Sequence, residues 1–277
     1  MKTIYDFGAY TGFAFVYDLF MDNIPYDMWC TYLKSLLEQY HIKSGIIAEL
    51  GCGTGNITKR LSNYGYDMIG IDCSEDMLSI AREKMMEEYD MMEKPPILYL
   101  MQDMRELELY GTVAAFISVC DSMNYLLEEK DLLQVFQVVN NYLDPSGIFI
   151  FDLKTEAYFE RLGENTFAEN REMASFFWEN NYHKETKINE YDLTVYISEN
   201  LLEDVEEEKE ESNLFLRFDE THYQRAYSLE KIKELLEKAG MKFLAAYDAF
   251  SNHPPCADSE RIYIVAQEQH QENKLYL

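Results

Sequence analysis

The strongest constraint on the fold is a cluster of three glycines directly behind a short apolar run. Residues 44–50 (SGIIAEL) are typical of a buried strand, and the segment 49–56 (ELGCGTGN) carries the glycines. Apolar side chains then recur at helical spacing through residues 57–64. The pattern predicts a strand, a tight glycine turn and a helix. Such a turn lets a ligand approach the backbone closely, and the helix start presents free N–H groups to an anionic or hydroxylated group.

The alternation of strand and helix continues along the chain. Further strands are predicted at 66–72, 97–101, 112–119 and 148–153, with a turn at 144–147 before the last. Helices are predicted at 25–40, 74–92, 131–143 and 228–239, and final strands at 242–249 and 261–267. Because the run 112–119 is apolar almost throughout, it indicates a strand covered on both faces, as in a parallel sheet. The expected fold is α/β, with a doubly wound, mostly parallel, seven-stranded sheet.

The segment between the predicted strand at 148–153 and the predicted helix at 228–239 has a different residue pattern. Residues 167–225 are rich in aromatic side chains and alternate apolar with polar positions, which is typical of antiparallel strands with one open face. The acidic run 203–211 lies between two such stretches, so we interpret it as a solvated hairpin connection and not as an ion-binding site. The segment is predicted to form an inserted antiparallel β cap.

Composition excludes several classes of function. The chain has 24 basic and 51 acidic residues, a net charge of −27, which opposes binding to nucleic acid or to an anionic membrane. Its five widely spaced cysteines, without a Cys-x-x-Cys pair, fit reduced thiols in a cytoplasm. No apolar run approaches the length of a membrane span. We therefore expect a cytoplasmic protein, and we expect no metal cofactor.

The glycine spacing separates two kinds of nucleotide ligand. A turn that binds a nicotinamide dinucleotide reads G-x-G-x-x-G/A, whereas this one reads G-x-G-x-G, with Asn56 where the last small residue belongs. Glu49 also places a carboxylate at the end of the strand, where it disfavours a pyrophosphate and suits an ammonium group. The sequence therefore favours a cationic or zwitterionic ligand.

The ordered motifs resemble the cofactor site of class I S-adenosylmethionine (SAM)-dependent methyltransferases. The glycine motif, the strand-end acid in GIDCSEDM and the segments QDM and CDS follow one another as they do in that family. The resemblance implies that Asp72 binds the ribose hydroxyls and that Cys73 and Met77 flank the adenine. It implies SAM as the cofactor, S-adenosylhomocysteine (SAH) as the product, and cofactor contacts from Tyr17, Glu49, Gly51, Cys52, Gly53, Thr54, Gly55, Asp72, Cys73, Met77, Asp103, Met104, Cys120 and Asp121.

The resemblance also divides the chain into functional parts. It implies an N-terminal helical lid at 1–43, a SAM-binding core at 44–154, a substrate cap at 155–225, and a C-terminal helix and strand pair at 226–277 that completes the core. The tyrosines of the lid segment look like those of small-molecule methyltransferases, in which a tyrosine near position 17 reaches the cofactor carboxylate.

The acceptor side of the site is predicted from the same resemblance and from the end of the cap. Tyr17 and His222 are the candidate catalytic groups, and a structural histidine is the alternative interpretation of His222. In an extended strand His222 and Arg225 face opposite sides, so at most one of them points into a pocket. Contacts with the methyl acceptor are expected from Tyr10, Asn124, Tyr125, Trp178 and Arg225.

The expected function is transfer of a methyl group from SAM to nitrogen or oxygen of a small-molecule acceptor by direct in-line displacement. An NAD-dependent oxidoreductase and a non-catalytic nucleoside-binding protein are the alternatives, because a cofactor motif indicates binding and not turnover. Nucleic acid and membrane are not expected partners, and the sequence leaves monomer and homodimer both open.

Overall fold

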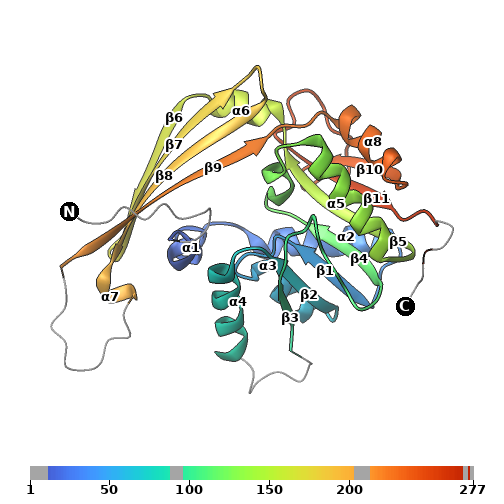
Figure 1. Ribbon diagram of the computed structural model, residues 1–277, viewed down its shortest axis with the longest axis horizontal. Helices are drawn as coiled ribbons and strands as arrows, with labels where there is room; N and C mark the ends of the chain where they lie inside the picture. Colours follow the sequence, from blue (N-terminus) through green and yellow to red (C-terminus); the bar gives the residue numbers. More distant parts are fainter. Residues whose placement is uncertain (1–11, 88–95, 203–212, 271–273, 275–277) are drawn as a thin grey trace.

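Two separate β-sheets organise the chain (Figure 1). The computed structural model describes residues 12–87, 96–202, 213–270 and 274. A seven-stranded sheet with helices forms the core, and a four-stranded antiparallel sheet stands to one side of it. The predicted combination of an α/β core with an antiparallel β insertion is confirmed.

The seven-stranded sheet has the strand order β10-β11-β5-β4-β1-β2-β3. Its strands are β1 (Ile46–Leu50), β2 (Asp67–Asp72), β3 (Leu98–Met101), β4 (Val113–Ser118), β5 (Leu143–Lys154), β10 (Lys242–Asp248) and β11 (Arg261–Gln267). Strands β1 to β5 are mutually parallel, whereas β11 pairs antiparallel with both β5 and β10. The order reverses between β1 and β4, so the loops that follow these two strands diverge and leave a crevice at the carboxyl edge of the sheet.

Helices cover both faces of this sheet. They are α2 (Tyr26–Gln39), α3 (Asn56–Asn63), α4 (Glu75–Glu87), α5 (Glu129–Tyr142) and α8 (Leu229–Lys238). Strand β4 shows why its sequence is apolar throughout: Phe116 packs with α5 and α8 on one face, while Ala115 and Ile117 pack with α2 and α3 on the other. A strand buried on both faces has no position that faces water.

The four-stranded sheet is the predicted cap, and it packs on the N-terminal helix. Its strands, in spatial order, are β6 (Asn165–Asn170), β7 (Ala174–His183), β8 (Ile188–Ser198) and β9 (Phe215–Arg225). Alternate residues of β8 turn inward, where Leu193 and Val195 join Phe13 and Phe20 in one apolar cluster. Helix α1 (Ala14–Phe20) therefore lies against the inner face of the cap sheet, between the cap and the core (Figure 1).

The structure differs from the sequence predictions in several local features. The predicted turn at 144–147 is a bulge inside β5, because Leu143 pairs with Val113 and Ile148 with Ala115. Asn124 and Tyr125 belong to a short 3-10 helix, η2 (Ser122–Tyr125), which was not predicted. Helices α6 (Glu156–Leu162) and α7 (Glu199–Leu202) were not predicted. The acidic run and the last residues of the predicted helix at 74–92 lie outside the described residues.

Candidate functional site

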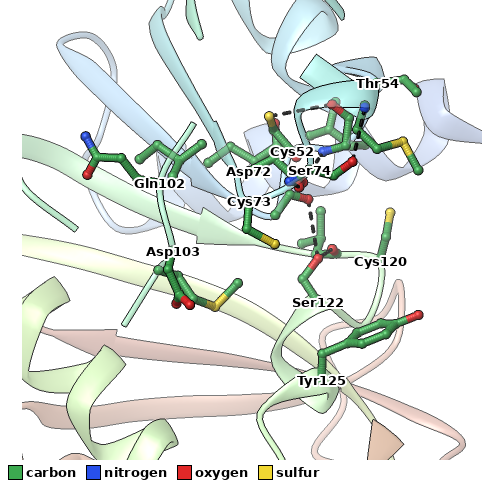
Figure 2. A pocket seen from close by; sticks show the side chains of 18 of the residues that line it. Cys52, Thr54, Asp72, Cys73, Ser74, Gln102, Asp103, Cys120, Ser122 and Tyr125 are labelled. Carbon is green, nitrogen blue, oxygen red and sulfur yellow. Dashed lines mark hydrogen bonds between the residues drawn. The ribbon is translucent and has the colours of Figure 1, made fainter. Parts of the chain in front are cut away.

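The carboxyl ends of β1 to β4 surround a cavity of about 290 Å³ (Figure 2). The glycine loop after β1 and the first turn of α4 after β2 form part of its wall. The segment after β3 and the turn after β4 form further parts of it. Because the cavity lies at the point where the strand order reverses, it occupies the place where open α/β sheets bind their ligands.

Each glycine of the glycine loop has a left-handed backbone, and their surroundings differ. A Cβ atom on Gly51 would lie 2.5 Å from the Ser122 hydroxyl, and one on Gly55 would lie 2.4 Å from the Tyr99 hydroxyl. A Cβ atom on Gly53 would meet nothing within 4 Å. Gly51 and Gly55 therefore serve close packing of the loop, whereas Gly53 leaves its backbone open to the cavity.

Asp72 ends β2 and holds the glycine loop in place. One carboxylate oxygen accepts the N–H of Gly53 at 2.8 Å, and the other accepts the N–H of Ser74 at 2.9 Å. Burial raises the pKa of Asp72 above its usual range, although these backbone hydrogen bonds act in the opposite direction. The carboxylate lies in the cavity wall, where it joins the loop after β1 to the start of α4 (Figure 2).

Glu49 lies beneath the glycine loop and is almost fully buried. The Thr58 hydroxyl, on the first turns of α3, donates a hydrogen bond to its carboxylate. Burial raises the pKa of Glu49 to about 8, and the nearby Asp72 adds to the shift. A buried carboxyl group with a raised pKa is stabilised as a carboxylate when a positive charge arrives beside it.

Glu49 is expected to make the ligand-free protein less stable as the pH rises. Its folded-state pKa lies above the usual 4.5, so its stabilising contribution is complete below about pH 4.5 and is lost as the pH rises through 8. Between about pH 6 and pH 8, the unfolding free energy of the parent protein should therefore fall by roughly 2 kcal/mol more than that of Glu49→Gln. Urea denaturation at the two pH values measures the difference.

Glu83→Gln is the matched control for that measurement, because Glu83 is exposed on α4. It should follow the parent protein at both pH values. Parallel pH dependences for Glu49→Gln and the parent protein would contradict the assignment of a raised pKa to Glu49.

The remaining walls of the cavity come from the segment after β3 and from the N-terminal segment. Arg105 binds the Asp103 carboxylate at 2.5 Å and lowers the pKa of Asp103 below its usual range. On another wall lie Tyr17 and Tyr26, and burial raises the pKa of both phenols. Figure 2 shows Gln102 and Asp103 on one side of the pocket and Cys120 and Tyr125 on the other. The cavity thus has two chemically distinct ends.

The structure brings most of the predicted site residues together around this one cavity. Those that line it are Tyr17, Glu49, Gly51, Cys52, Gly53, Thr54, Asp72, Cys73, Met77, Asp103, Met104, Cys120 and Tyr125. Tyr10 lies outside the described residues. Gly55 sits behind the loop against Tyr99, and its N–H donates to the carbonyl oxygen of Cys52.

Five other predicted residues are engaged elsewhere. Asn124 is buried and binds the carbonyl oxygens of Lys154 and Arg225, so it ties β5 to β9. Arg225 donates to the carbonyl oxygen of Leu127, on the opposite side of β9 from His222. Trp178 lies on the inner face of the cap, where its ring stacks with that of His222. Asp121 turns into an ionic cluster. His222 does not line the cavity, but its Nδ1 lies 3.1 Å from the hydroxyl of Tyr125, which does.

The sequence interpretation missed several residues of the cavity wall. Ser122 and Gln102 belong to the segments CDS and QDM, but neither residue was predicted to contact the cofactor. Tyr26 is one of the tyrosines of the lid segment and was not predicted to line the cavity either. Asp131 and Leu126 carry no local signal, because only the path of the chain after β4 brings them to the wall. The other unselected wall residues are Asn56, Ile57, Ile71, Ser74, Arg105 and Val119.

Comparison with known proteins identifies the family. Residues 47–147 match the methyltransferase domain family. The putative methyltransferase YqeM of Bacillus subtilis is 34% identical to this chain over 260 residues, which cover 93% of this chain and 96% of that protein. The chain belongs to the class I SAM-dependent methyltransferases. The family expected from the ordered motifs is thus confirmed.

Solved structures share the fold of this methyltransferase. A SAM-dependent methyltransferase from Clostridium acetobutylicum superposes with a TM-score of 0.77 at 24% identity, covering 95% of this chain and 100% of that one. The sugar N-methyltransferase KedS8 from a Streptoalloteichus species superposes with a TM-score of 0.73 at 14% identity and covers 98% of both chains. Both coverages include the cap as well as the core.

In this methyltransferase the N-terminal helix is bound directly to the glycine loop. Asp18 of α1 accepts hydrogen bonds from Thr54 and Asn56, each at 2.7 Å, and pairs with Lys84 of α4 at 2.6 Å. The neighbouring residue, Tyr17, is thereby held in the cavity wall.

Neither a metal-ion cluster nor a membrane-spanning helix is found among the described residues. Within the described ranges, no group of three or more His, Cys, Asp or Glu side chains is arranged to hold a metal ion. In the same part of the chain, no helix is both long and apolar enough to cross a membrane.

Proposed function

We propose that this methyltransferase binds SAM in the cavity with the ribose at Asp72, and that it methylates nitrogen or oxygen of a small molecule. The observation that carries the proposal is the Asp72 carboxylate beside the open backbone of Gly53. A carboxylate offers two acceptor atoms to a pair of ribose hydroxyls, and a residue without Cβ lets the cofactor lie against the chain. We also propose that the lid ends at residue 43, the SAM-binding core at residue 154 and the substrate cap at residue 225.

The residues present fit SAM better than a nicotinamide dinucleotide. Glu49 and Asp72 place two carboxyl groups at the glycine loop, which suit ammonium and hydroxyl groups, and neither offers a pyrophosphate a positive charge. In this orientation Cys73, Met77 and Asp103 contact the adenine end, and Tyr17 contacts the methionine end. Bound SAM supplies an electrophilic methyl group on a sulfonium, and the role of the chain is to hold the acceptor in line with it.

The cap supports a small acceptor. Helix α1 is bound to the glycine loop on one side and packs on the inner face of the cap sheet on the other, so the lid joins the cap to the cavity wall. The similar chain KedS8 is a sugar N-methyltransferase, and its fold covers the cap segment as well. A cavity of about 290 Å³ near such a cap favours a small molecule as the methyl acceptor.

Thermal unfolding with two ligands tests the cofactor assignment. At about 100 times its dissociation constant, SAH should add roughly 2.7 kcal/mol to the unfolding free energy and raise the melting temperature, because it binds only the folded protein. NAD at the same concentration should leave the melting temperature unchanged. Stabilisation by NAD and not by SAH would overturn the proposal.

Turnover separates an enzyme from a passive nucleoside-binding protein. A panel of small amines, sugars and phenols, scored by release of SAH from SAM, should contain an acceptor whose product carries the methyl group on nitrogen or oxygen. A product methylated on carbon or sulfur would contradict the acceptor chemistry proposed here while leaving the cofactor assignment intact.

A further inference from the structure

The half-buried Tyr125 and the buried His222 and Glu220 form a series of hydrogen bonds that starts at the cavity wall and ends at the N-terminal helix. The Tyr125 hydroxyl lies 3.1 Å from Nδ1 of His222, and Nε2 of His222 lies 3.0 Å from the Glu220 carboxylate. The other carboxylate oxygen of Glu220 accepts the backbone N–H of Phe13 at 2.8 Å. The side chains of His222 and Glu220 are almost fully buried, with 1% and 0% of their surface exposed. This series of hydrogen bonds connects the core, the cap and the start of α1.

The chemistry of Glu220 fixes the direction of these hydrogen bonds. Its carboxylate accepts from Phe13 and stands next to Nε2 of His222, so a neutral imidazole carries its proton on Nε2 and donates it to Glu220. Nδ1 then holds a lone pair and accepts the proton of the Tyr125 hydroxyl. A hydroxyl oxygen that donates its proton in this way can still accept a hydrogen bond through its own lone pairs.

Tyr125 stands where the methyl group would be transferred. It lines the cavity on the same side as Cys120, across from Gln102 and Asp103 (Figure 2). If the ribose and adenine lie at Asp72 and Asp103, as the proposed function has it, the sulfonium end of the cofactor points toward this other side. The position of Tyr125 therefore places a proton acceptor next to the atom that attacks the methyl group.

We propose that Tyr125 is a catalytic residue that accepts the proton of the methyl acceptor, and that His222 and Glu220 are positioning residues that make it able to do so. This inference rests on the proposed function and deepens it. The lone pair of the acceptor nitrogen or oxygen forms a bond to the methyl carbon, the carbon–sulfur bond breaks, and sulfur keeps that electron pair. The acceptor proton passes to the Tyr125 oxygen as the Tyr125 proton passes to Nδ1 of His222. The resulting imidazolium is paired with the Glu220 carboxylate.

This series of hydrogen bonds limits which kinds of methyl acceptor the site can serve. It is useful only for an acceptor that carries an N–H or O–H bond at the reacting atom, such as a primary or secondary amine or a hydroxyl group. A tertiary amine or a thioether has no proton to give up there. We therefore infer a protic amine or hydroxyl compound as the methyl acceptor.

Sinefungin, a SAM analogue that carries an amine where SAM carries its methyl group, tests the role of Tyr125 without a known acceptor. Isothermal titration calorimetry compares its affinity with that of SAH, which has no group there. We expect the parent protein to bind sinefungin about 10-fold more tightly than SAH, because the ammonium group donates to Tyr125. Tyr125→Phe should abolish that preference and change SAH affinity by less than about twofold. Glu220→Gln should reduce the preference about threefold.

Tyr223→Phe is the matched control, because Tyr223 is the exposed neighbour of His222 on β9 and its hydroxyl donates to Glu190. It should keep the sinefungin preference of the parent protein. The role of Tyr125 would be overturned if Tyr125→Phe kept the preference for sinefungin or lost affinity for sinefungin and SAH equally. It would also be overturned if the parent protein bound the two ligands equally well. If the parent protein bound neither ligand, the cofactor assignment itself would fail, and the two failures are thus distinguishable.

Discussion

Asp72→Ala is expected to weaken SAH binding by about 100-fold or more while the protein still folds. The variant loses a carboxylate that offers two acceptor atoms to the ribose hydroxyls, and hydrogen bonds to charged groups are worth roughly 1.5–3 kcal/mol each. It also releases the N–H groups of Gly53 and Ser74, which the Asp72 carboxylate holds at 2.8 and 2.9 Å. The loop loses its preorganised shape, which adds to the loss of affinity. Isothermal titration calorimetry with SAH measures the effect.

Asp67→Ala provides the matched control for this experiment. Asp67 begins the same strand, β2, and is exposed at the edge of the sheet opposite the cavity. The same substitution there should leave SAH affinity unchanged, and a circular dichroism melt should show both variants folded. An Asp72→Ala protein that binds SAH within about threefold of the parent would contradict the ribose assignment.

The core of the fold and one half of the site could be predicted from the sequence, because their signals are local. The apolar run before Gly51 and the helical spacing after Asn56 each arise from burial within one short segment, and their ends agree with β1 and α3 within about two residues. Asp72 was found for the same reason. Parallel strands end at a common edge, so polar residues that follow successive strands meet there without any further information.

The acceptor side of the site could not be predicted in the same way. His222 and Tyr125 are 97 positions apart, and their contact depends on how the cap sheet sits on the core. Period-2 alternation correctly placed His222 and Arg225 on opposite sides of β9, but it carries no information about which side faces Tyr125. Helix α6 did have a local signal that was overlooked, because Thr155 precedes it and accepts the N–H of Tyr158 as a helix cap.

Asp121 shows how a local signal can lead to a different structure. The sequence placed it at the end of β4 and suggested a cofactor contact, but its carboxylate binds Lys154 at 2.9 Å and Arg261 at 2.7 Å. Gln224 of the cap donates to it as well, at 2.6 Å. These cations lower the pKa of Asp121 despite its burial. The partners come from β5, β9 and β11, so nothing near position 121 in the sequence predicts them.

This ionic cluster connects the cap to the cavity. Cys120 and Asp121 both have left-handed backbones, which are strained for residues with a side chain. Their N–H groups are held by the fully buried carboxylate of Asp152, which Arg261 also binds. The turn that places Cys120 in the cavity wall is therefore maintained by charged side chains from β5 and β11. Loss of one charge is expected to disturb the fold and the cavity together.

Arg261→Gln is accordingly expected to reduce the unfolding free energy at neutral pH by about 3–5 kcal/mol, because it leaves the buried carboxylates of Asp121 and Asp152 without their shared cation. Burial already raises the pKa of Asp152, and loss of Arg261 raises it further. A carboxyl group with a raised folded-state pKa stabilises the protein at low pH and loses that contribution as the pH rises through the folded pKa. The deficit of the variant should therefore shrink as the pH falls toward about 5.

Urea denaturation across that pH range, with Arg161→Gln as the control, decides whether the cluster contributes in this way. Arg161 pairs with Glu260 at the surface, where the two side chains are 63% and 41% exposed, and its loss should cost less than about 1 kcal/mol. Equal losses for the two arginine variants would show that Arg261 contributes no more than a surface pair. If the loss of unfolding free energy in Arg261→Gln did not change with pH, it would arise instead from lost packing on Trp29. The Arg261 guanidinium lies 5.3 Å from the centre of the Trp29 ring.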